Sequence, residues 1–103
     1  MKKHKVKIDQ DALDDIQDIT DWYNLQQKGL GKRFQDSTIK QINSLDKYPY
    51  SNIIRYGEFR CMIIDKFPYM AHYIINKETN EVEVFAIINT SRNPEIWQEK
   101  TGK

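Results

Sequence analysis

The sequence predicts an α+β domain in which an N-terminal helical hairpin packs on one face of an antiparallel four-stranded sheet. A short helix is predicted near the end of the chain. Two observations carry this fold class. Residues 55–92 contain three apolar, strand-like runs joined by short connections. The residues before them carry two apolar stripes at helical spacing, separated by a break that contains two glycines. We expect one domain over residues 1–103, because no linker or internal repeat interrupts the chain.

The first predicted elements are a strand and a helix. Charged and apolar side chains alternate in Lys5-Val6-Lys7-Ile8, which predicts a short strand added to the sheet. A helix follows, with Asp9 or Asp11 as its cap and more aspartates in its first turns, where the helix dipole favours negative charge. Its apolar face comprises Ala12, Ile16, Ile19 and Tyr23, with Leu13 and Trp22 at the margins.

A second predicted helix completes the hairpin. Gly29 and Gly31 permit a tight reversal, and the helical pattern resumes at Leu30. Pro49 marks the end of this element. Its buried face comprises Leu30, Phe34, Thr38, Ile42 and Leu45, with Gln41 in the same sector.

The three later runs predict an antiparallel meander. They cover residues 59–65, 69–76 and 81–89, and connections this short join neighbouring antiparallel strands. In the last run the alternation breaks at Phe85 and Ile87, so its far end is apolar on both faces. The helical hairpin covers one face only. We therefore expect the chain to leave the other face largely uncovered, shielded in part by a short final helix at residues 93–97.

Composition excludes several classes of function. The formal charge of +1 and the pI near 7.8 lack the basic balance of a typical nucleic-acid binder. A single cysteine, Cys61, indicates a reducing, cytoplasmic setting, and no stretch is apolar enough to span a membrane. The two histidines and the cysteine have no metal-ligand spacing, and no glycine-rich phosphate loop is present. We expect neither a metal nor a cofactor.

A few polar and aromatic residues are candidates for function. His72 has the chemistry for proton transfer, but a strand histidine of this kind is more often a surface or hydrogen-bonded residue. Arg60 and Arg92 have the chemistry to hold an anion, and the alternative is a structural ion pair or packing of the side chain. Tyr69 and Tyr73 are interpreted as core or rim aromatics rather than base-stacking platforms.

The order and spacing of several segments resemble a known family. These segments are Leu30-Gly31-Lys32-Arg33-Phe34, Pro49, Arg60, Phe67-Pro68-Tyr69 followed by Tyr73, and Thr90-Ser91-Arg92-Asn93-Pro94-Glu95-Ile96-Trp97. Together they are similar to the RelE/ParE toxins of bacterial type II toxin-antitoxin systems, which include plasmid stabilisation proteins. The resemblance implies a small cytoplasmic growth inhibitor encoded beside an antitoxin, whose C-terminal segment wraps the toxin. It also suggests that the uncovered sheet face receives this partner.

The resemblance implies one of two mechanisms. RelE-like members cleave messenger RNA on the ribosome without metal, using basic side chains around the scissile phosphate. ParE-like members poison DNA gyrase and have no hydrolytic site. The ribonucleases usually carry basic residues at the positions that match Cys61, Ile63 and Met70, and many carry a histidine at the position of Asn89. Only Arg92 keeps a matching charge, so the sequence favours the gyrase-directed, non-nucleolytic mechanism.

Two alternatives stay open. In the first, the chain is a metal-independent endoribonuclease with Arg92, Arg60 and Tyr73 as catalytic candidates. Tyr56 or Lys66 is then a possible displaced proton acceptor. In the second, the scaffold has lost toxicity and serves only as a binding module. Under any of these functions, the residues expected to contact the antitoxin or the target (gyrase, or the ribosome with its messenger RNA) are Arg60, Tyr69, Tyr73, Asn89, Arg92 and Trp97.

Overall fold

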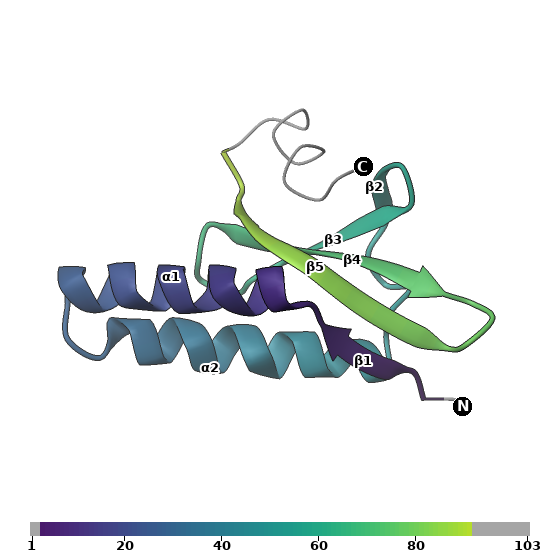
Figure 1. The fold of residues 1–103 in the computed structure, drawn as a ribbon. Helices are drawn as coiled ribbons and strands as arrows, with labels where there is room; N and C mark the ends of the chain where they lie inside the picture. The colour runs from purple at the N-terminus through teal and green to yellow at the C-terminus, as the bar shows by residue number, and fades with distance from the viewer. Residues whose placement is uncertain (1–2, 92–103) are drawn as a thin grey trace.

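The computed structural model of this chain describes residues 3–91, so the predicted helix at residues 93–97 lies outside the described part. It contains a five-stranded sheet in the order β1-β5-β4-β3-β2, with two antiparallel helices packed on one face (Figure 1). This arrangement confirms the α+β class and the N-terminal helical hairpin. The elements are β1 (Lys5–Ile8), α1 (Gln10–Gln26), α2 (Leu30–Asn43), the 3-10 turn η1 (Ser44–Asp46), β2 (Ile54–Tyr56), β3 (Phe59–Ile63), β4 (Tyr69–Asn76) and β5 (Glu81–Asn89).

The prediction of a four-stranded, wholly antiparallel sheet is wrong in two respects. First, β1 lies parallel to β5, with Lys5 opposite Glu81 and Ile8 opposite Val84. Alternating side chains look the same in either strand direction, so the pattern in β1 could not reveal this. Second, the short strand β2 pairs with β3 and makes the sheet five-stranded and mixed. Three residues are too few to display a period.

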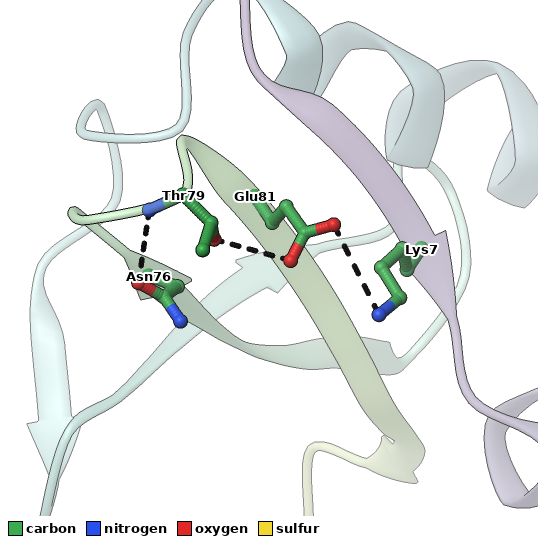
Figure 2. A network of polar contacts seen from close by, with 4 residues as sticks. All are labelled: Lys7, Asn76, Thr79 and Glu81. Atoms are coloured by element: carbon green, nitrogen blue, oxygen red, sulfur yellow. Dashed lines mark hydrogen bonds and ion pairs between the residues drawn. The ribbon is translucent and has the colours of Figure 1, made fainter.

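The β4–β5 turn is joined to β1 by polar contacts (Figure 2). Asn76 Oδ1 accepts a hydrogen bond from the backbone N–H of Thr79 at 3.2 Å. The hydroxyl of Thr79 donates to Glu81 at 3.1 Å, and Glu81 also lies 4.0 Å from the ammonium group of Lys7. Exposed pairs of this kind contribute little to stability. They agree with the register in which β1 begins directly opposite this turn.

A β-bulge explains the break in alternation near the end of the chain. His72 lies opposite Ala86 but Tyr73 lies opposite Val84, so Phe85 is an extra residue on β5. A bulge of one residue exchanges the faces on which the following side chains lie. Val84 therefore packs toward the helices, whereas Ala86 belongs to the cluster on the opposite face.

We call the sheet face that packs against the helices the near face. Its buried cluster consists of Ala12, Ile16, Phe34, Ile42, Leu45, Met62, Ile64, Ala71, Tyr73, Val82, Val84 and Ile87. The ring of Phe34 lies at the centre of an aromatic group and is 5.2 Å from Phe67, 5.5 Å from Tyr23 and 5.6 Å from Tyr69. The predicted apolar stripes of both helices thus meet the sheet as expected, and most of the chain's apolar burial lies here.

The two helices approach each other closely at Gly31. Its backbone N–H donates a 2.8 Å hydrogen bond to Asn24 Oδ1. A Cβ atom at this position would lie 2.2 Å from the carbonyl oxygen of Thr20, which is far inside contact distance. Gly29 precedes it with a φ of 88°, in the left-handed region that glycine favours. The glycine break therefore provides both the reversal and the close helix contact.

Asp15 of α1 bonds to the backbone of β5 beyond the point where β1 ends. β1 pairs with β5 only as far as Val84. Beyond that point the buried carboxylate of Asp15 accepts a 3.0 Å hydrogen bond from the backbone N–H of Ile87. A buried backbone N–H without a partner is costly, so this side chain substitutes for a neighbouring strand.

Candidate functional site

We call the opposite side of the sheet the far face, and its cluster is buried as well. It consists of Tyr56, Phe59, Cys61, Met70, Ala86 and Ile88, each between 0 and 9% exposed. The expectation of an uncovered apolar face is therefore wrong for these residues. One physical reason is β2, because it brings the ring of Tyr56 into a stack with Phe59 at 4.9 Å. Phe85 at the bulge adds an edge contact to Phe59 at 5.5 Å.

His72 lies fully buried beside this cluster. Its Nδ1 atom is 2.9 Å from the hydroxyl of Tyr56 and 3.4 Å from the sulfur of Cys61. Burial, with the nearby charge of Arg55, lowers the pKa of His72 to about 4. Burial raises the pKa of the Cys61 thiol to about 11, although Arg55 opposes this shift. Both groups are therefore neutral near pH 7, and the interpretation of His72 as a hydrogen-bonded residue is confirmed.

Tyr73 lies on the near face, and its side chain is fully buried. Its hydroxyl donates to the carbonyl oxygen of Pro49 at 2.7 Å and accepts from Asn52 Nδ2 at 3.1 Å. Burial raises the pKa of Tyr73, while the Asn52 hydrogen bond and the charge of Arg60 lower it in part. These contacts attach the segment after η1 to β4. They leave the hydroxyl neutral and hydrogen-bonded at physiological pH.

Arg60 lies directly opposite Tyr73 in the β3–β4 ladder, and its side chain contacts the same segment. Its Nη1 atom donates a 2.6 Å hydrogen bond to the carbonyl oxygen of Asn52. Its guanidinium carbon also lies 5.1 Å from the ring centre of Tyr50, which is within cation–π distance. The structure thus brings the candidates Arg60 and Tyr73 together around Asn52. Of the two interpretations of Arg60, these contacts match the structural one.

Two further candidates, Tyr69 and Asn89, pair with each other at a different end of the sheet. Tyr69 is half-buried beside Phe34 and lies opposite Asn89. Asn89 Oδ1 accepts hydrogen bonds from the backbone N–H and the hydroxyl of Ser91, at 2.8 and 2.6 Å. These bonds shape the turn after β5. Arg92 and Trp97 lie outside the described residues, so their predicted roles stay predictions.

A cleft beside β3 contains residues that the sequence analysis did not single out as functional. Its volume is about 490 Å³, and its lining residues are Gln41, Ser51, Asn52, Ile53, Arg55, Cys61, Met62 and Ile63. Arg55 is exposed, and no acidic side chain of residues 3–91 forms an ion pair with it. The residues around Arg55 show no hydrophobic periodicity that would mark them as part of a site. The one sequence feature that pointed to this cleft was Gln41, a polar residue within an otherwise apolar helical face.

Two other kinds of feature are absent from the described residues. Among residues 3–91, no group of three or more histidine, cysteine, aspartate or glutamate side chains is arranged to hold a metal ion. Within the same range, no helix is both long and apolar enough to cross a membrane.

Comparison with known families decides the affiliation. The sequence profile of the family described as "ParE toxin of type II toxin-antitoxin system, parDE" matches residues 6–94. The chain belongs to the ParE toxin family. It is therefore a ParE toxin of a type II toxin-antitoxin system, in agreement with the resemblance found in the sequence. No curated protein gives a significant match to the chain.

Solved structures share the fold of this ParE family member at low sequence identity. The chromosomal ParDE system from P. aeruginosa superposes with a TM-score of 0.76 at 14% identity, covering 86% of this chain and 98% of that chain. A free mutant of E. coli toxin RelE gives 0.69 at 16% identity, covering 97% and 96%. The intact E. coli RelBE toxin-antitoxin complex gives 0.64 at 16%, covering 86% and 99%. Identities this low establish a common fold and no more.

Proposed function

We propose that this ParE family member inhibits growth by acting on DNA gyrase without cleaving RNA, and that a cognate antitoxin neutralises it in the cytoplasm. The ParDE and RelBE structures are toxin-antitoxin assemblies with the same toxin fold, which supports an antitoxin as partner. The family profile is that of ParE toxins, which supports the gyrase-directed mechanism over the ribonuclease mechanism.

One observation carries the proposal, namely the chemistry of the far face. The resemblance implies that RelE-like ribonucleases usually carry basic residues at the positions of Cys61, Ile63 and Met70. None of the three is basic here: Cys61 and Met70 are buried in an apolar cluster, and Ile63 is an exposed aliphatic side chain. A basic side chain that neutralises phosphate charge must reach solvent and the substrate. A thiol and a thioether packed against Ala86 and Ile88 do neither.

The described ionisable groups support the same conclusion. General-base catalysis near neutral pH needs a group that can accept a proton there and lies within reach of the substrate. His72 has its pKa lowered to about 4 and is fully buried. The hydroxyl of Tyr73 has its pKa raised and is hydrogen-bonded to Pro49 and Asn52. The burial of both side chains supports the non-nucleolytic mechanism.

Controlled expression in bacteria separates the possible functions. We expect induction of the toxin alone to stop growth and to accumulate covalent gyrase–DNA cleavage complexes, with messenger RNA intact by primer extension. Co-expression of the protein encoded beside the gene should restore growth. Ribosome-dependent cuts in messenger RNA would instead establish the ribonuclease, and Arg92→Ala should then abolish cutting. Unimpaired growth would identify a non-toxic binding module.

A further inference from the structure

We propose that residues 47–54, which lead from η1 into β2 and which we call the η1–β2 segment, bind an apolar pocket with an acidic rim on DNA gyrase. This inference rests on the proposed function, since it takes gyrase as the target. Three features of the described residues support the assignment: exposed apolar side chains, a backbone attached to the sheet, and charge of one sign.

The first feature is the exposure of large apolar side chains in this segment. Tyr48, Tyr50, Ile53 and Ile54 are 60, 48, 71 and 52% exposed. They are four of the eight large hydrophobic side chains that lie exposed within residues 3–91, and they are close together in the sequence. Isolated exposed side chains of this kind are common, whereas a concentration of them marks an interaction surface. Tyrosine is also among the residues that contribute most to binding energy at protein interfaces.

The second feature is the attachment of the segment to the sheet, although most of it forms turns rather than a strand. The carbonyl oxygen of Pro49 and the side chain of Asn52 bond to the buried hydroxyl of Tyr73, at 2.7 and 3.1 Å. Arg60 donates to the carbonyl oxygen of Asn52 at 2.6 Å, and its guanidinium lies over the ring of Tyr50. These contacts hold the backbone beneath side chains that the chain itself leaves exposed. A loop that is already ordered loses little conformational entropy when it binds a partner.

The third feature is the charge of the segment and its surroundings. Residues 47–57 contain two cations, Lys47 and Arg55, and no aspartate or glutamate. Both cations are exposed, and neither forms an ion pair with an acidic side chain of residues 3–91. Carboxylates around an apolar pocket would complement cations at the two ends of an apolar stretch. Because binding of a DNA backbone depends on clustered lysine and arginine side chains, the charge favours a protein surface over DNA.

The form of this surface favours gyrase over the antitoxin. Exposed side chains on an ordered loop fit a pocket that exists before the partner arrives, and a folded target such as gyrase can provide one. The proposed antitoxin contact is instead a segment that folds on binding, and such a segment needs a groove on the toxin. We therefore assign the η1–β2 segment to the target.

Substitutions at Tyr48 and Ile53 test this assignment. Tyr48→Asp and Ile53→Asp each remove an exposed apolar contact and place a carboxylate opposite the acidic rim. We expect each to raise the concentration of toxin that halves gyrase supercoiling activity by about tenfold or more. Ile53→Lys should raise it less, because its charge matches the rim, and an equal loss in the two Ile53 variants would contradict an acidic rim.

The matched control is Leu25→Asp on α1, at a side chain 83% exposed, which should inhibit gyrase as the wild type does. Thermal unfolding separates loss of contact from loss of fold. Because each substitution changes an exposed side chain, every variant should melt within about 4 °C of the wild type.

Hydrogen exchange on the wild type gives an independent readout. We expect gyrase with plasmid DNA to slow exchange of the backbone amides of residues 50–53, and DNA alone to leave them unchanged. Protection by DNA alone would assign the segment to DNA instead. Inhibition of gyrase by Tyr48→Asp and Ile53→Asp at the wild-type concentration would overturn the assignment while gyrase stays the target.

Binding of the antitoxin encoded beside the gene separates the remaining outcomes. If the two aspartate variants still inhibit gyrase but no longer bind the antitoxin, the segment belongs to the antitoxin and the assignment is overturned. If the wild type itself leaves gyrase active, the proposed function fails, and the assignment fails with it.

Discussion

The two faces of the sheet are both buried, but they are built differently. The near face is a large cluster assembled from both helices and three strands, and the buried Tyr73 hydroxyl within it has two hydrogen-bond partners. The far face is a smaller cluster that adjoins the buried His72, which lies between Tyr56 and Cys61. The near face therefore carries most of the fold's stability. The far face adds a buried ionisable group to a packed apolar surface.

One scaffold can therefore alter its chemistry when apolar side chains fill one face of its sheet. At two positions where the resemblance to RelE-like ribonucleases would lead us to expect cationic side chains, Cys61 and Met70 contribute to packing. Burying a cation at those positions without a partner would be costly. The same two residues therefore make the far face apolar and leave these positions without a cation.

The largest expected effect is the loss of an aromatic ring from the near face. We expect Phe34→Ala to reduce the free energy of unfolding by about 3–5 kcal/mol. The ring is fully buried and contacts three other aromatic rings. Phe59→Ala on the far face should cost less, because that cluster is smaller. Urea unfolding of both variants measures the difference, and a greater loss for Phe59→Ala would reverse the ranking of the faces.

The next effect is a pH dependence that arises at the far face. The pKa of His72 is about 4 in the folded protein, below the ordinary value of 6.5. The unfolded chain therefore binds the proton first, so stability is fully present above about pH 6.5 and falls as the pH drops toward 4. The full loss is about 3 kcal/mol at 1.36 kcal/mol per pKa unit.

The matched comparison for this pH effect is His72→Gln, which cannot titrate. The difference in melting temperature between wild type and variant should shrink or reverse between pH 7 and pH 4.5, while carboxylate effects common to both proteins cancel. A difference that stays constant over this range would show that His72 does not titrate as its burial requires.

A smaller effect is expected at the edge of β5. Asp15→Ala removes the acceptor for the buried N–H of Ile87, and an unsatisfied group of this kind costs about 1–3 kcal/mol. Asp18→Ala, at an exposed position of the same helix, is the control and should change stability by less than about 0.5 kcal/mol. Equal losses in the two variants would mean that the Asp15 contact does not support the sheet.

The smallest effect is expected at Tyr73. Tyr73→Phe keeps the buried ring but removes the hydrogen bonds to Pro49 and Asn52, for a loss of about 0.5–1.5 kcal/mol. Tyr48→Phe, at a side chain 60% exposed, should leave stability unchanged. If Tyr73→Phe is as stable as the wild type yet loses toxicity, the hydroxyl has a functional role and the structural interpretation of Tyr73 is wrong.

The sequence predicted those features that follow from local periodicity. The two helices, the limits of β4 and β5, and the glycine break before α2 all depend on side chains close in the sequence. What escaped prediction depends on contacts between distant residues. Lys5 and Glu81 are neighbours only once the parallel strand has docked, and Phe85 becomes an extra residue only relative to β4.

The candidate site was less predictable than the fold for the same reason. Arg60 and Tyr73 were chosen for their chemistry, and the structure shows that Asn52 joins them. Burial of the far face was missed, because the sequence analysis did not predict β2, the strand that places Tyr56 against Phe59. The carboxylate of Asp15 and the amide of Gln41 act on backbone groups of remote strands, and no local pattern indicates this use.

The central claim is that a packed apolar far face accompanies action on gyrase rather than on RNA. The most direct measurement adds the purified protein to two parallel reactions, one with gyrase and plasmid DNA and one with translating ribosomes and messenger RNA. We predict loss of supercoiling activity with trapped cleavage complexes in the first reaction and uncut messenger RNA in the second. Codon-positioned cuts in the ribosome reaction, with gyrase unaffected, would contradict the account.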